Sequence, residues 1–129
     1  MARPIIHFEI IGRNPVNLRR FYAQLFGWEF EVGGAVSPLV SDAGDYGFLA
    51  PPTGAQPVAG GVGGGRNFDP HTIIYVSVTD IETYLAKAEQ LGGSRVLGPE
   101  RSPGTPLTIG QFRDPEGNLV GLAQIDENT

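Results

Sequence analysis

The stretch Ile5–Gly27, IIHFEIIGRNPVNLRRFYAQLFG, decides the fold, because the same plan returns 66 positions later at His71–Gly93. Each copy has an apolar extended run, a turn residue, an amphipathic helical segment and a closing glycine. Ile10 of the first copy is matched by Val76 of the second. A repeat near half the chain length indicates two structural modules that do not each close a core alone. A seam between such modules is a usual place for a ligand.

The composition of the 129 residues is that of a globular protein, with 40% hydrophobic and 18% charged residues. The 19 glycines and 11 prolines predict many turns and short strands rather than a helix bundle. A net charge of −5, with no cluster of Lys and Arg, argues against nucleic acid as a partner. The lack of cysteine excludes disulfides, thiolate catalysis and Cys-bound zinc. No signal peptide or membrane-length apolar run is recognisable, so we expect a cytoplasmic protein without a membrane partner.

The first half predicts one βαβββ module of about residues 1–64. Asn14 followed by Pro15 is typical of a helix start, and Gly27 of a helix end. Strands are expected at 5–11, 28–32, 36–40, 46–50 and 58–62. The glycine-rich run 60–65 lacks the Lys-Ser/Thr of a phosphate-binding loop, so we interpret it as a weak strand followed by a flexible linker.

The second half, about residues 67–129, predicts a second βαβββ module. Asp80 or Thr79 caps the expected helix. The inner face of that helix is expected to hold Ile81, Tyr84, Leu85, Ala88 and Leu91. Strands are expected at 72–78, 94–100, 107–113 and 119–124, with a tight turn at 114–118 (DPEGN). Both modules together are expected to form a single α+β domain over 1–129.

Three sequence features resemble the vicinal-oxygen-chelate superfamily, which includes glyoxalase I, bleomycin-resistance proteins and extradiol dioxygenases. They are a histidine in the first strand, Phe21-Tyr22 followed by LFGW at 25–28, and DPEGN at 114–118. The resemblance covers essentially the whole chain. It implies paired βαβββ modules whose curled, mixed sheets surround a cleft, and a homodimer.

Enzymes of that superfamily bind a divalent metal through His or Glu side chains on the first and last strands of each module. His7 matches the first of these positions, whereas the second module carries Ile73 there. The two last-strand positions fall on Gly121 and near Gly60. Only His7 of the four ligand positions is kept. Because the chain departs from the ligand pattern of those enzymes, we expect a protein without a metal or other cofactor. A relocated metal site is the alternative, built from His7, Glu9 and His71.

Alternation along the strands predicts which side chains face the cleft. Phe8, Ile10, Ile74 and Val76 are expected in the core. The side chains expected to contact a ligand are His7, Glu9, Tyr75, Gln111 and Gly121, the last as a small residue that leaves room. The aromatic residues expected in the core or in a dimer interface are Trp28, Phe30, Tyr46 and Phe48.

The leading functional hypothesis is a protein that binds a small organic molecule in this cleft without a metal. It would either sequester the ligand, as bleomycin-resistance proteins do, or act on it by metal-independent chemistry. The alternative is an enzyme of the lyase, isomerase or oxidoreductase type known from glyoxalases and dioxygenases, with or without a divalent metal. In such an enzyme His7 and Glu9 would be catalytic, since a carboxylate can orient a histidine that acts as a general base.

Overall fold

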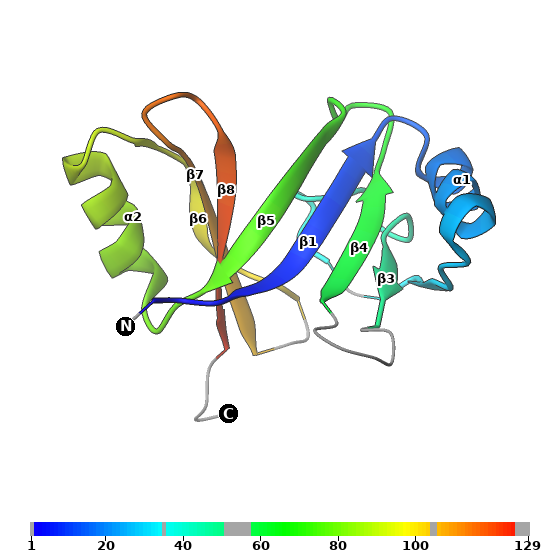
Figure 1. The fold of residues 1–129 in the computed structure, drawn as a ribbon, viewed down its shortest axis with the longest axis horizontal. Helices are drawn as coiled ribbons and strands as arrows, with labels where there is room; N and C mark the ends of the chain where they lie inside the picture. The colour runs from blue at the N-terminus through cyan, green and yellow to red at the C-terminus, as the bar shows by residue number, and fades with distance from the viewer. Residues whose placement is uncertain (1, 35, 51–57, 104–105, 126–129) are drawn as a thin grey trace. The chain divides into compact units, whose positions relative to one another are not determined.

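A computed structural model describes residues 2–34, 36–50, 58–103 and 106–125. The chain falls into two compact units by its internal contacts, one of residues 7–72 and one of residues 2–6 with 73–125. The described residues contain eight strands and two helices, in the order βαβββ-βαβββ along the chain (Figure 1). The assignment of both modules to one domain stays a prediction.

The first module contains β1 (Ile5–Gly12), α1 (Pro15–Phe26), β2 (Glu31–Val32), β3 (Gly47–Leu49) and β4 (Ala59–Gly64). Its strands lie in the order β2-β3-β4-β1. β1 is parallel to β4, whereas β3 is antiparallel to both β4 and β2. Helix α1 packs against β4 (Figure 1).

The second module contains β5 (His71–Ser77), α2 (Ile81–Gln90), β6 (Ser94–Arg101), β7 (Leu107–Arg113) and β8 (Leu119–Ile125). The order β5-β8-β7-β6, with β5 parallel to β8, repeats the plan of the first module. The paired βαβββ, α+β fold expected from the sequence repeat is therefore confirmed. Residues before β1 belong to this unit, where the Ser77 amide donates to the Pro4 carbonyl over 2.9 Å.

The local signals around α1 and the DPEGN turn are confirmed. The Asn14 side chain accepts a hydrogen bond from the Asn17 amide at 3.1 Å, and Gly27 ends α1 with a φ of 72°. In the turn, the Asp114 carboxylate accepts bonds of 2.9 Å from the Glu116 and Asn118 amides. Bonds from the side chain and amide of Asn118 lower the pKa of Asp114. Such local hydrogen bonds explain why these segments were predictable from sequence alone.

Helix α2 forms the core of its unit by packing on β6, β7 and β8 (Figure 1). Ile81 and Leu85 are fully buried against Leu122. Two expectations are wrong here. Leu91 is 70% exposed because the helix ends at Gln90, and Ile74 on β5 is 41% exposed.

The expected strand at 36–40 is wrong, and the strand at 28–32 is reduced to β2. Residues 37–41 form a turn in which the Ser37 carbonyl accepts from the Val40 amide at 2.9 Å. The Ser37 hydroxyl accepts from the Leu39 amide at 3.2 Å. A serine that bonds to nearby amides competes with strand pairing, and Pro38 has no amide hydrogen to give to a sheet.

Among the described residues, neither helix has the length and apolarity that crossing a membrane requires.

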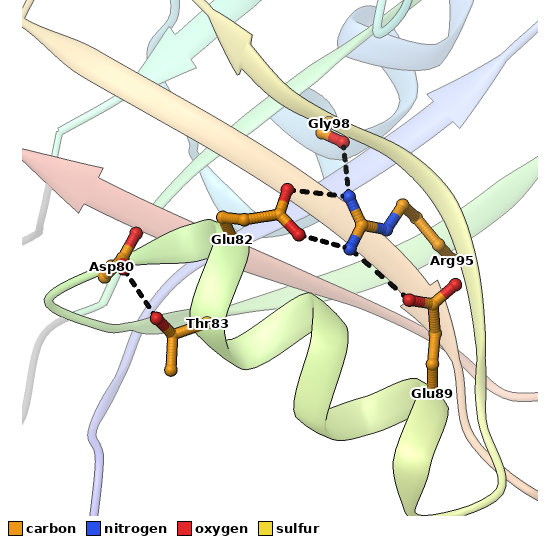
Figure 2. Close-up of polar contacts among 6 residues, drawn as sticks. All are labelled: Asp80, Glu82, Thr83, Glu89, Arg95 and Gly98. Atoms are coloured by element: carbon orange, nitrogen blue, oxygen red, sulfur yellow. Dashed lines mark hydrogen bonds and ion pairs between the residues drawn. The ribbon is translucent and has the colours of Figure 1, made fainter.

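An ion-pair cluster joins α2 to β6 (Figure 2). The Arg95 guanidinium donates to both carboxylate oxygens of Glu82, at 2.8 and 2.7 Å, and to Glu89 at 3.4 Å. The Arg95 hydrogen bonds hold the pKa of Glu82 below its ordinary value of 4.5. Because two parallel bonds fix the guanidinium plane, the cluster gives a specific contact between α2 and β6.

Substitution Glu82→Gln is expected to lower the unfolding temperature at pH 7. A carboxylate with a lowered pKa stabilises the fold above pH 4.5, and this contribution is lost as the pH falls through the folded-state value. The gap in unfolding temperature between wild type and Glu82→Gln should therefore close in acid. Glu29→Gln removes the same charge from an exposed position and is the control. A difference in unfolding temperature between wild type and Glu82→Gln that stays constant from pH 7 into acid would contradict a stabilising ion pair.

Candidate functional site

The glycines of β4 make room for aromatic side chains on the two faces of the first module's sheet. A Cβ atom at Gly60 would overlap the ring of Phe8, and one at Gly61 would overlap the phenol of Tyr46. All residues of β4 from Gly60 onward are buried. The strand predicted at 58–62 is therefore observed as β4, but the expected flexible linker after it is wrong at Gly63 and Gly64, which continue this central strand. The missing side chains of β4 are replaced by the rings of neighbouring residues.

The phenol of Tyr46 joins His7 to Glu9. The Tyr46 hydroxyl lies 2.9 Å from His7 Nε2, and it donates to Glu9 Oε2 over 2.9 Å. Glu9 is only 4% exposed, and His7 is half-buried. Tyr46 immediately precedes β3, and its ring crosses β4 at Gly61 to reach β1. His7 and Glu9 are thus brought together as expected, through a residue that was expected only to pack.

The direction of these bonds assigns the protons. A phenol has one hydrogen, and Tyr46 gives it to Glu9, so the Tyr46 oxygen accepts from His7. With Glu9 ionised, the tautomer of His7 that fits this arrangement carries its hydrogen on Nε2 and leaves Nδ1 as an acceptor. Burial lowers the pKa of His7 from 6.5 to about 4, because the charged imidazolium loses its hydration. His7 is neutral at pH 7.

Apolar rings flank this polar cluster. The His7 ring stacks on Phe48 with ring centres 6.3 Å apart and planes 12° apart. Phe48 is aligned with Gly61, on the strand next to β4. On the other face of β1, Phe8 lies 5.5 Å from Trp28, which in turn stacks on Tyr22 of α1. The predicted alternation of β1, with Phe8 toward the helix and His7 with Glu9 on the opposite face, is confirmed.

The second module carries a related polar pair in its own sheet. Tyr75, Gly121 and Gln111 are aligned across β5, β8 and β7. The Tyr75 ring occupies the space where a Cβ at Gly121 would stand, and its hydroxyl accepts a 2.9 Å bond from the Gln111 amide. Both side chains are buried. The space that Gly121 was expected to leave for a ligand is filled by Tyr75.

The donor set does not fit a divalent metal. Gly61 pairs with Glu9 in the first module as Gly121 pairs with Tyr75 in the second. Both last-strand ligand positions are therefore glycines, each covered by a tyrosine ring. Ile73 offers no donor atom. Over residues 2–34, 36–50, 58–103 and 106–125, no three His, Asp or Glu side chains gather closely enough to hold an ion. The relocated site of His7, Glu9 and His71 is therefore not formed.

Tyr46 is the functional candidate that the sequence interpretation missed. The available signal was the spacing of Gly61 and Gly63, which leaves one face of β4 without side chains. A Cβ at Gly63 would lie 2.8 Å from the Tyr46 ring. Alternate glycines in a strand often mark the close approach of another group, but the identity of that group depends on strand register.

Comparisons with known proteins agree with this architecture. The sequence profile of the glyoxalase-like domain matches residues 9–123. No curated protein sequence gives a significant match. A variant of methylmalonyl-CoA epimerase from Streptomyces coelicolor, in complex with 2-nitronate-propionyl-CoA, is 16% identical with a TM-score of 0.67, covering 98% of this chain and 97% of the epimerase.

Two further solved structures are similar over most of their length. A hypothetical protein from Bacillus halodurans C-125 is 13% identical with a TM-score of 0.65, covering 100% of this chain and 99% of that one. Methylmalonyl-CoA epimerase from Mycobacterium tuberculosis is 14% identical with a TM-score of 0.62, covering 95% and 87%. At such identities the likeness establishes the fold alone.

Proposed function

The chain belongs to the glyoxalase-like domain family, and on that premise we propose that it binds a small organic molecule on the sheet face that carries His7, Tyr46 and Glu9. The observation that carries the proposal is the Tyr46 bridge, which fixes an imidazole and a buried carboxylate side by side. A few fixed polar groups within an apolar surface are what small-molecule sites use to orient a ligand.

Binding without chemistry, of the kind that bleomycin-resistance proteins perform, is the form of this function that we favour. With a pKa of about 4, His7 is a weak base at pH 7, whereas an efficient general base has a pKa near the working pH. The metal donors of the superfamily's enzymes are missing. The net charge of −5 favours a neutral or cationic ligand.

A proton-transfer enzyme is the second candidate, and the chain of hydrogen bonds favours it. One phenol links His7 to Glu9, so a proton accepted at one end can be matched by a proton released at the other. The similar epimerase structures support the same chemistry, because they hold methylmalonyl-CoA or 2-nitronate-propionyl-CoA. The first has an acidic hydrogen beside a carbonyl, and a nitronate resembles the planar anion left when that hydrogen is removed.

Two further parts of the proposal concern the second module and the oligomeric state. Tyr75 and Gln111 stay predicted as ligand-contacting residues of the second module, whereas Gly121 is covered by the Tyr75 ring. The homodimer implied by the superfamily also stays a prediction, supported by exposed apolar side chains such as Val96 and Ile125 on β6 and β8. Light scattering in solution measures the mass that decides it.

The substitution His7→Ala separates the two candidates. Bleomycin, a cationic probe, and methylmalonyl-CoA, an anionic one, are titrated by calorimetry. For a binding protein we expect His7→Ala to weaken the probe that binds by about tenfold, the value of one good hydrogen bond. For an enzyme, exchange of the methylmalonyl-CoA α-hydrogen with deuterium should fall by about 10²- to 10⁴-fold.

The matched control is Gln24→Ala, which changes an exposed polar side chain of the same module outside the His7–Tyr46–Glu9 cluster and should leave the affinity of either probe unchanged. A probe whose affinity falls with Gln24→Ala but not with His7→Ala would contradict the proposed site.

A further inference from the structure

A hollow of about 740 Å³ lies on the unit of residues 7–72, where β1 passes into α1. Its walls come from the end of β1, the first two turns of α1 and residues 70–72. None of the residues that line it belongs to the His7–Tyr46–Glu9 cluster. Its volume is within the range of about 300–1,000 Å³ that is typical of small-molecule sites.

The walls of the hollow are largely apolar and include two aromatic rings. Phe21 and Tyr22 meet edge to face, with ring centres 5.0 Å apart and planes 88° apart. Phe21 is 55% exposed, so much of its ring is open to an occupant of the hollow. Ile10 and Leu18 complete this apolar side. An occupant of the hollow would therefore remove aromatic surface from water, which favours a flat, ring-containing molecule.

The polar wall of the hollow consists of His71 together with Arg13, Asn14 and Asn17, and His71 is the one that offers a ring nitrogen. Its Nδ1 lies 2.8 Å from the Asp69 carbonyl oxygen. A carbonyl can only accept, so Nδ1 of the neutral ring carries the hydrogen and Nε2 is an acceptor. The Asp69 carboxylate pairs with the Arg13 guanidinium, so the charges beside the hollow cancel. A neutral ligand with a hydrogen-bond donor matches this arrangement.

We infer that this hollow is a second ligand site, which takes a neutral aromatic molecule whose hydroxyl donates to His71 Nε2. The rings of Phe21 and Tyr22 hold the apolar body of the ligand, and His71 selects its hydroxyl. The site is separate from the Tyr46 face and does not depend on the function proposed for that face.

Two probes that differ only in the hydroxyl test the inference, namely 4-hydroxybiphenyl and 4-methoxybiphenyl. The methoxy group keeps the oxygen but has no hydrogen to donate. In a ¹H–¹⁵N titration of the whole chain, 4-hydroxybiphenyl should bind saturably and shift the amides of residues 10–14 and 71–72. It should bind about three- to tenfold more tightly than 4-methoxybiphenyl, as expected for one hydrogen bond.

Two variants check the two sides of the hollow. His71→Phe keeps a flat ring without the acceptor, so it should reduce the affinity for 4-hydroxybiphenyl to that for 4-methoxybiphenyl. Phe21→Ala should weaken both probes by about tenfold through the loss of a ring contact. Leu25→Ala is the matched control, because Leu25 is 58% exposed on the same helix but does not line the hollow.

Three results would overturn the inference. One is equal affinity for the two probes in the wild type, and another is unchanged affinity in Phe21→Ala. The third is a set of shifted amides centred on His7 and Tyr46, which would place the probe on the other face and leave the function proposed there intact.

Discussion

Replacing Gly61 with alanine is expected to lower the free energy of unfolding by about 3 kcal/mol, the upper part of the range for overfilling a packed interior. The new Cβ would overlap the phenol of Tyr46, including its hydroxyl oxygen. Gly61 lies in the middle of β4 between β1 and β3, so neither neighbouring strand can move aside easily. Urea unfolding followed by circular dichroism measures the change.

The controls separate this overlap from the general effect of adding a methyl group. Gly34→Ala is the same substitution where a Cβ would meet nothing within 4 Å, and it should change the free energy of unfolding by less than about 0.5 kcal/mol. In a Tyr46→Ala background, Gly61→Ala should cost less than about 1 kcal/mol, because the ring it would meet is gone. An equal cost with and without the Tyr46 ring would contradict the packing described.

The second large effect is a loss of stability in mild acid that comes from His7. The unfolded chain takes up a proton at His7 near pH 6.5, whereas the folded chain does so only near pH 4. Between these two pH values the unfolded state binds more protons than the folded state. The free energy of unfolding therefore decreases as the pH decreases. The expected loss is about 3 kcal/mol from pH 7 to pH 4, at 1.36 kcal/mol for each unit of pKa shift.

Urea unfolding at a series of pH values measures this loss. In His7→Gln the part of the slope between pH 6.5 and pH 4 that comes from His7 should disappear. Gln24→Ala changes an exposed side chain that does not titrate and should keep the wild-type slope. Parallel pH profiles for the wild type and His7→Gln would show that His7 titrates at its ordinary pKa in the folded chain.

The elements that the sequence predicted well are those set by local chemistry. Asn14 and Gly27 mark the two ends of α1. Asn14 accepts a hydrogen bond from a helix amide, and Gly27 adopts a positive φ angle that few other residues adopt. The doubled pattern at Ile5–Gly27 and His71–Gly93 predicted two βαβββ modules, which are confirmed. The strand histidine, Phe21-Tyr22 with LFGW, and DPEGN gave the resemblance to the vicinal-oxygen-chelate superfamily, which is confirmed as well.

The parts that the sequence did not predict depend on contacts between distant segments. Tyr46 was expected to be a packing residue, because nothing near it in sequence shows that its ring crosses Gly61 to reach β1. Ile74 was expected in the core together with Val76, but only Val76 packs against the buried cluster around Leu85, which the alternation of β5 does not show. Both errors concern register and coverage, which non-local packing decides.

The bridge from His7 through Tyr46 to Glu9, without a metal, is tested most directly by a long-range ¹H–¹⁵N correlation spectrum of the histidine rings at pH 7. His7, assigned by comparison with His7→Gln, should be neutral, protonated at Nε2 and unchanged by added zinc. A ring that is charged or protonated at Nδ1, or nitrogens that shift when zinc is added, would contradict it.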